Sequence, residues 1–488
     1  MSVDEPQLSG HEVRQRAKRS VVLVGGREIA IRALQVGGFL VLARLLPPEA
    51  FGLVAFGMVF VHITIVATQA GIGTTLIRQK DPPEPGDLAT LLGFQLVVAT
   101  LLSAGIAGVG LMFGTAGHVT ALLVAALPLL ALRSPANVVL ERRLDYRWIV
   151  YADVAETVVY FGWATTTALL GWGVWALASA VLPRALAGTV LLLAATREGR
   201  ILPRVSLARL RRMLAFGSRV QGVDFVYLGR DQGLNVGIAW IGGTVELGVW
   251  SLAFRIMQIP YILVSTLVRV SLPAISRLIH AGEDVSRSLE RAVSLTALVA
   301  GATLAPFVAA LPLLVPAVLG ESWNAVAEVL PWACLGLVVS GPISVAAAGY
   351  LYAIGDATTP LRAAVAHAVM WLATTFALLD LVGIRAAGIG WLVGAIVDAA
   401  ILGRGVARTS SARVLRPLLW PTTLAIVGAG AGYLLPGSGI LGAVGAAVTA
   451  EAVFLLGIAL FARDRLRDLL RLIGEAVGLT RLGAADAV

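Results

Sequence analysis

Charged and amide side chains occur inside long apolar stretches of this 488-residue chain, where they could bind an anion. The stretch FVYLGRDQGLNVGIAW, residues 225–240, places Arg230 beside Asp231. Asp224 precedes Asp231 by seven residues, so a helix would present both on one face. A guanidinium stays charged and offers a rigid fork of donors, which suits a phosphate. The pattern predicts an anion site whose acids hold the arginines while it is empty.

Similar side chains occur in two other apolar stretches. Glu28 and Arg32 are four residues apart and can pair on a helix. Arg255 and Gln258 begin a polar stripe along a third helix. A charge in hydrocarbon costs several kcal/mol unless it faces partners or water, so these residues favour a hydrated cavity. Salt bridges that only join packed helices are the alternative. The residues predicted to line the cavity are Arg27, Glu28, Arg32, Asp224, Arg230, Asp231, Arg255, Gln258 and Arg269.

The elements that position these residues are predicted to be transmembrane helices. The chain is 58% hydrophobic and only 14% charged, with a mean hydropathy of +0.86, which is typical of a polytopic membrane protein. Hydropathy predicts about fourteen helices. Their expected ranges are 20–46, 49–76, 88–112, 117–138, 148–170, 173–196, 217–241, 246–273, 292–318, 325–353, 360–380, 384–404, 417–435 and 439–462.

Basic residues indicate the orientation of these helices. Arginines gather in alternate connections, such as 133–147 and 197–219, and after residue 463. By contrast, Arg44 and Arg385 are the basic residues of the other set of loops. The positive-inside rule therefore predicts that both termini are cytoplasmic. Contact with anionic lipid headgroups accounts for the net charge of +9, so nucleic acid is not an expected partner.

An internal repeat predicts two related halves. A shift of 196 residues places Gly52 on Gly248 and His62 on Gln258. Six helices separate the copies, which predicts two parallel, pseudo-symmetric six-helix lobes in a V around a central cavity, plus a C-terminal helix pair. The expected segments are a cytoplasmic tail 1–19, an N-lobe 20–196, a basic linker 197–216, a C-lobe 217–404, helices 13 and 14 in 405–462, and an amphipathic tail 463–488.

Signatures of enzyme chemistry are absent from the sequence. There is no G-x-x-x-x-G-K-[ST] loop and no His/Cys cluster with metal-ligand spacing, so we expect neither catalysis, a metal nor a cofactor. Cys334 lies in an apolar run and is expected to be a small buried residue. Coupling to protons or sodium ions stays open. His62 and His367 are expected to serve packing or hydrogen bonding.

Several motifs in collinear order resemble those of one transporter family. They are ARLLPPEAFGLVAFGMVF, GIGTTLIRQKDPPEPGDLATLLGFQL, RRLDYRWIVYADVAE, GRDQGLNVGIAWIGGTVELGVWSLAFRIMQIP and YLYAIGDATTPLR, which together span roughly 20–362. This pattern resembles the Wzx-type oligosaccharide flippases of the multidrug/oligosaccharidyl-lipid/polysaccharide exporter superfamily. The chain departs from it at Gln69, where members often carry an acid, and at Arg230, where they often have an Asn-x-Asp motif.

The resemblance implies a function in the bacterial inner membrane. Such a protein would carry an undecaprenyl-pyrophosphate-linked oligosaccharide to the outer leaflet by alternating access, for cell-surface polysaccharide synthesis. Its partners would be this substrate, membrane lipids, and the polymerase and glycosyltransferases of the pathway. An ion-coupled multidrug antiporter and a lipid II-type flippase are alternatives within the superfamily. A scaffold that transports nothing is a third class, but it would have no need for a charged cavity.

Overall fold

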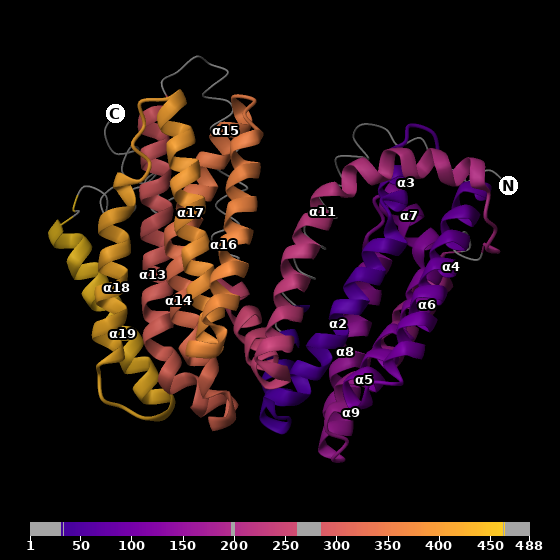
Figure 1. Cartoon of the computed structure of the whole chain (residues 1–488), viewed down its shortest axis with the longest axis horizontal. Helices are drawn as coiled ribbons and strands as arrows, with labels where there is room; N and C mark the ends of the chain where they lie inside the picture. Colours follow the sequence, from indigo (N-terminus) through magenta and orange to yellow (C-terminus); the bar gives the residue numbers. More distant parts are fainter. Residues whose placement is uncertain (1–30, 33, 197–200, 261–284, 462, 464–488) are drawn as a thin grey trace, which may run out of the picture. The chain divides into compact units, whose positions relative to one another are not determined.

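The computed structural model describes residues 31–32, 34–196, 201–260, 285–461 and 463; the side chains of 216–227 and 345 are outside this description. Within these ranges the regular structure is helical, and no strand occurs (Figure 1). In that part of the chain, nine helices are long and apolar enough to cross a membrane. A helix satisfies its own backbone hydrogen bonds, which a membrane interior requires. The prediction of an all-α polytopic membrane protein is therefore confirmed.

Contacts divide the chain into two compact units, 1–248 and 249–488. The limits predicted for the N-lobe and the C-lobe stay predictions. The first unit contains a helix at Leu34–Leu45 and the start of a helix at 243–260. Its other helices are α2 Pro48–Gln69, α3 Ile72–Arg78, α4 Pro85–Gly110, α5 Gly114–Val124, α6 Leu127–Leu132, α7 Ser134–Arg142, α8 Arg147–Leu169, α9 Val174–Ser179, α10 Val181–Ala195 and α11 Leu207–Ile241.

Three of the predicted membrane helices are interrupted. The range 49–76 breaks between α2 and α3, where Ala70 and Gly71 adopt positive φ angles of 42° and 69°. The range 117–138 is divided among α5, α6 and α7, and Pro128 and Pro135 stand in the first turns of α6 and α7. Proline lacks the N–H that would continue a preceding helix, so it favours a new start. The range 173–196 divides at Ala180 into α9 and α10.

Part of the predicted basic linker 197–216 is held against α4. The N–H of Arg204 donates to the carbonyl oxygen of Ala89 at 3.1 Å. Further on, Nη1 of Arg209 lies 2.7 Å from a carboxylate oxygen of Glu84 and 2.8 Å from one of Asp87. These hydrogen bonds, first the one that Arg209 donates to Asp87, raise the pKa of Arg209. The linker is therefore attached to the first unit through its backbone and a charged side chain.

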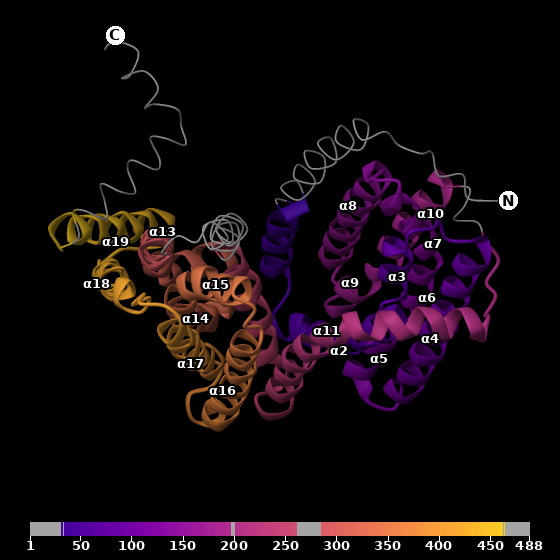
Figure 2. The same cartoon turned by 90° about the horizontal axis from the view of Figure 1, so that it is seen from above.

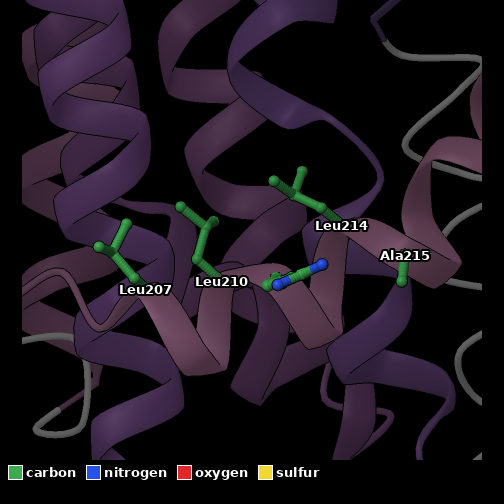
Figure 3. A pocket seen from close by; sticks show the side chains of 5 residues that line it. Leu207, Leu210, Leu214 and Ala215 are labelled. Carbon is green, nitrogen blue, oxygen red and sulfur yellow. The ribbon is translucent and has the colours of Figure 1, made fainter.

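The helix α11 begins ten residues before the predicted membrane helix 217–241. Its first turns lie across the ends of α3 and α4, and the helix then bends (Figure 1). Met213 is buried in the core beneath it, which includes Ile72 and Leu88. A shallow hollow of about 630 Å³ lies along this helix (Figure 3) and is lined by Leu207, Leu210, Arg211, Leu214 and Ala215. Leucines beside arginines are typical of a helix at a membrane interface.

The two glycines that the repeat aligns lie against each other. A Cβ on Gly52 would overlap the carbonyl oxygen of Thr244 and lie 3.0 Å from the nitrogen of Gly248. Reciprocally, a Cβ on Gly248 would overlap the carbonyl oxygen of Pro48 and lie 3.0 Å from the nitrogen of Gly52. Thr244 is itself 196 residues after Pro48. Two segments that the repeat aligns are therefore in contact through glycines within the first unit.

The second unit is organised around α13. Its elements are the rest of the 243–260 helix, α13 Ser286–Leu319, η1 Glu321–Trp323, α14 Asn324–Ile343, the π-helix η2 Ser344–Ala348, α15 Gly349–Ala353, α16 Thr358–Val382, α17 Arg385–Thr409, η3 Arg416–Leu418, α18 Leu419–Tyr433 and α19 Gly439–Phe461. Figures 1 and 2 show α18 and α19 beside α13. Gly301 of α13 leaves room for the ring of Phe454, so the predicted C-terminal pair packs on this helix.

Candidate functional site

The polar centre of α11 contains an ion pair between neighbours in sequence. Nε of Arg230 donates to a carboxylate oxygen of Asp231 at 2.7 Å. The two side chains are 21% and 39% exposed, so both can be reached. One turn on, the amide of Asn235 donates to Gln232 at 3.4 Å. Both members of this ion pair come from one helix, and a partly exposed guanidinium is accessible to another anion.

A histidine of α2 lies near this pair. His62 is within electrostatic reach of Asp231, and its ring is hydrogen-bonded to the backbone of Met58. The helices α2 and α11 pack against each other. His62 is therefore hydrogen-bonded as the sequence predicts, and the polar region extends across two helices of the first unit.

The other predicted cavity residues are placed only in part. Arg32 is exposed in the first unit, while Arg255 is exposed and Gln258 half-buried in the second. Arg255 and Gln258 are three residues apart and share a helix face. Asp224 lies on α11, but its side chain is among those not described. Arg27, Glu28 and Arg269 lie outside the described residues. The arrangement brings Arg230 and Asp231 together, and the shared cavity stays a prediction.

A second charged cluster was not among the predicted cavity residues. The carboxylate of Glu156 on α8 accepts hydrogen bonds from Nη1 of Arg133 and, at 3.2 Å, from Nε of Arg184 on α10. The Glu156 side chain is only 5% exposed. An acid in the apolar run YADVAETVVYFGWA and an arginine in VLPRALAG were the available sequence signals. Spacing along one helix could not connect them, because the residues come from different helices.

The position of Arg133 corrects the expected connection 133–147. The chain is helical from Ser134 to Arg142, so most of that segment is not a loop. At about 1.5 Å per residue, the nine residues of α7 place Arg133 roughly 14 Å from the turn before α8. The expected helix 117–138 covered the first part of α7 but not its end, which carries Glu141 and Arg142. The carbonyls of Leu76 and Gln79 accept hydrogen bonds from Arg142, at 2.9 and 2.8 Å.

One acid in the second unit lies beside an irregular helix. Asp398 on α17 accepts a hydrogen bond from Oγ of Ser344 at 3.1 Å. Ser344 begins the π-helix η2, and π-helical turns are frequent at functional sites. Within the described ranges, no three His, Cys, Asp or Glu residues gather in a way that could hold a metal ion. Asp398 is therefore of interest as a proton carrier or a cation contact.

Cys334 is buried on α14, as expected from its apolar run.

Known proteins resemble this chain in both sequence and fold. Residues 41–328 match the family described as "Polysaccharide biosynthesis protein". The succinoglycan biosynthesis transport protein ExoT of Rhizobium meliloti (strain 1021) is 26% identical over 315 residues, which cover 61% of this chain and 60% of that protein. The match thus spans less than two thirds of the curated relative.

Solved structures give the fold. The lipid II flippase MurJ in an inward closed conformation has a TM-score of 0.70 at 12% identity, covering 91% of this chain and all of that one. An inward-facing multidrug resistance MATE transporter of the MOP superfamily has a TM-score of 0.52 at 15% identity, covering 83% and 98%. At these identities the likeness concerns the fold alone, and that fold is one used by membrane transporters.

Proposed function

The chain belongs to the polysaccharide biosynthesis protein family, and from this we propose that it is a flippase for undecaprenyl-pyrophosphate-linked oligosaccharides. It would move the glycan head from the inner to the outer leaflet by alternating access of a cavity between two lobes. The family match and the transporter fold support a multi-pass membrane transporter of polysaccharide biosynthesis. The identity of the carrier lipid and the direction of movement are the finer parts of the proposal.

The observation that carries the proposal is the accessible Arg230–Asp231 pair in the middle of α11. A diphosphate is a strong acceptor for the planar donors of a guanidinium. When substrate binds, its phosphate would displace the carboxylate of Asp231. The guanidinium of Arg230 would then keep an anionic partner throughout the exchange. Removing one partner of a buried charge pair is costly, whereas exchange avoids that state.

Further residues are assigned to the same cavity as part of the proposal. Arg255 would provide a second guanidinium, with Gln258 on its face of the helix as a donor and acceptor for sugar hydroxyls. The remaining members are Arg27, Glu28, Arg32, Asp224 and Arg269. The long apolar tail of the substrate need not enter this polar space, because it can stay in the surrounding lipid.

Two alternatives in the superfamily differ in the substrate they need. A multidrug antiporter moves amphipathic cations, and such a site favours acids over arginines. A lipid II-type flippase would bind the same diphosphate with a different sugar. The arginines of its site would therefore not differ from those of an oligosaccharide flippase. Competition separates them: an excess of unlabelled lipid II should slow the flipping of labelled oligosaccharide only if both occupy the site. A scaffold without transport would flip neither.

A flipping assay in proteoliposomes tests the proposal. Purified Arg230→Gln and Arg255→Gln proteins should insert normally but move a fluorescent undecaprenyl-pyrophosphate-linked oligosaccharide at least about tenfold more slowly, since a charge-assisted hydrogen bond is worth about 1.5–3 kcal/mol. Arg385→Gln is the matched control, because Arg385 pairs with the exposed Glu328 at 2.9 Å. Transport at the wild-type rate in both arginine variants would refute the phosphate-binding role.

Orientation and coupling belong to the same proposal. We place the protein in the bacterial inner membrane with both termini in the cytoplasm. In a Cys334→Ala background, an impermeant thiol reagent outside the cell should label Ser438→Cys and not Ser411→Cys; both positions are exposed. The reverse pattern would overturn the orientation. Transport would be driven by protons or sodium ions, with Asp398 as the carboxyl group that exchanges them. The polymerase and glycosyltransferases of the pathway would be its partners.

A further inference from the structure

The charged cluster around Glu156 is assembled by three parts of the first unit. Arg133 comes from the junction of α6 and α7, Glu156 from the middle of α8, and Arg184 from α10. Arg184 also lies near the middle of the candidate membrane span Val174–Ala195. Glu156 and Arg184 are therefore far from the ends of their helices, where a charged side chain could extend to the membrane surface.

The surroundings of Glu156 fit a carboxylate in a fixed position. A Cβ on Gly188 of α10 would overlap a carboxylate oxygen of Glu156, so the absence of a side chain there makes room for the acid. The hydroxyl of Thr189 donates to the carbonyl oxygen of Leu129 at 3.0 Å and ties α10 to α6. Arg133 is mostly covered, at 19% exposure. Arg133 and Glu156 thus form a covered ion pair in a fixed position.

Arg184 differs from Arg133 in its access. Its side chain is 49% exposed, and its guanidinium carbon lies 5.9 Å from the centre of the Tyr160 ring. Among the described atoms, only Nε of Arg184 donates to Glu156, so the terminal edge of the guanidinium, formed by the two Nη groups, is not used in this ion pair. An aromatic face positions a guanidinium while leaving its edge available for a planar acceptor.

The charges in this cluster do not cancel. Among the residues that the structure describes, two guanidinium groups share the carboxylate of Glu156, so these ion pairs carry one net positive charge. An uncompensated charge in the membrane interior is costly unless water or an anion meets it. Because Arg184 is exposed, an anion can contact it and compensate this charge. A cluster that only held helices together would be better served by one arginine than by two.

We infer that Arg184 is the contact residue of a second anion-binding site, within the first unit, that takes the phosphate groups of a lipid-linked diphosphate. Arg133 and Glu156 act as positioning residues that hold it. The inference rests on the proposed flippase function and adds a site to it, away from Arg230. A carboxylate on an acidic sugar of the glycan would offer similar acceptor chemistry, so the probes below separate the two sources.

Binding to the full-length protein in detergent tests the inference. The probes are farnesyl pyrophosphate, inorganic pyrophosphate, farnesol and glucuronate. We expect wild-type protein to bind farnesyl pyrophosphate, and Arg184→Gln to bind it about tenfold or more weakly, as expected for losing a charge-assisted hydrogen bond. Arg184→Lys keeps the charge without the fork and should bind with intermediate affinity. Arg147→Gln, which removes an exposed ion pair with Asp145 at the start of α8, is the control.

The thermal unfolding midpoint, measured on the same samples, distinguishes a ligand-binding role of Arg184 from a structural role. Weaker binding of farnesyl pyrophosphate by both Arg184 variants, with an unfolding midpoint close to that of Arg147→Gln, supports the site. Wild-type affinity in both variants overturns it, and so does a lowered midpoint with unchanged affinity, which would make Arg184 a brace. Tight binding of glucuronate that Arg184→Gln abolishes, with farnesyl pyrophosphate unaffected, also overturns the phosphate assignment.

The same measurements distinguish failure of this inference from failure of the proposed function. If wild-type protein binds farnesyl pyrophosphate no better than farnesol, both fail together. If Arg230→Gln weakens binding and Arg184→Gln does not, the flippase proposal stands and the second site is wrong. Inorganic pyrophosphate shows whether the headgroup alone is recognised, and its affinity should fall in parallel with that of farnesyl pyrophosphate in Arg184→Gln.

Discussion

Two charged regions of the first unit use arginine in different ways. On α11, Arg230 donates to its neighbour Asp231, and both side chains are partly exposed. In the cluster around Glu156, two arginines from different helices share one carboxylate that is almost fully covered. The first arrangement can be opened without moving helices, whereas the second connects α8 with α10. The difference indicates that one bundle can contain an arginine beside an accessible acid and arginines that are positioned by a covered acid.

Removing the shared carboxylate should have the largest effect. Glu156→Gln would leave two cations near the middle of the bundle without their acid, and we expect a loss of about 3–5 kcal/mol in the free energy of unfolding. Thermal or denaturant unfolding in detergent measures it. Glu328→Gln removes the carboxylate of an exposed pair and should change stability by less than about 1 kcal/mol. Equal effects would show that the cluster is not a buried one.

Crowding the same carboxylate should have the next largest effect. Gly188→Ala would place a methyl group against Glu156 and should cost about 1–3 kcal/mol, as other overpacked sites do. Gly229→Ala is the matched control, because no atom lies within 4 Å of a Cβ at this position beside Arg230. It should be neutral or stabilise the helix by up to about 1 kcal/mol. A larger loss for Gly229→Ala would reverse the comparison.

The neighbouring pair on α11 should show a small effect on stability and a coupled effect on transport. Asp231→Asn should lower the free energy of unfolding by no more than about 1 kcal/mol, since both partners are partly exposed. Arg230→Gln should slow flipping less when Asp231 is also neutralised, because no bare carboxylate then remains. A double-mutant cycle of flipping rates measures this coupling. Additive losses would mean that the two residues act independently.

The smallest effect should come from Asp356, a half-buried acid in a turn of the second unit. Hydrogen bonds from the hydroxyl and backbone N–H groups of Thr359 and Thr358 lower the pKa of Asp356 from 3.8 to about 2. Its contribution to stability is therefore present above about pH 4 and is lost as the pH falls towards 2. Asp356→Asn should flatten this part of the profile of unfolding midpoint against pH. An unchanged profile would exclude Asp356 as its source.

Much of the fold was predictable because apolar runs of about twenty residues have few alternatives in a membrane. The repeat also predicted which glycines correspond, Gly52 and Gly248, and the structure brings these two into contact. Helix breaks at Ala70 and before Pro128 were not predicted, because hydropathy averages over them. The bend that carries α11 across the first unit depends on contacts with α3 and α4 that no local pattern records.

The candidate site was predictable only where its residues are close in sequence. Arg230 and Asp231 are neighbours, so their pairing could be read from one stretch. Glu156 and Arg184 are 28 residues apart on different helices, and Arg133 lay where the expected helix 117–138 overlaps the expected basic connection 133–147. Helical spacing relates residues on one helix and gives no information about which helices pack together. The cluster could therefore be found only from the packed structure.

The most direct test of the account is the chemical selectivity of transport by wild-type protein. Two fluorescent substrates with the same sugar and the same polyprenyl chain would be reconstituted in proteoliposomes, one joined through a diphosphate and the other through a neutral glycosidic bond. We predict that protein accelerates flipping of the diphosphate-linked substrate and leaves the neutral one at the rate of protein-free vesicles. Equal acceleration of both, or movement of a cationic dye in preference to either, would contradict an arginine-based flippase.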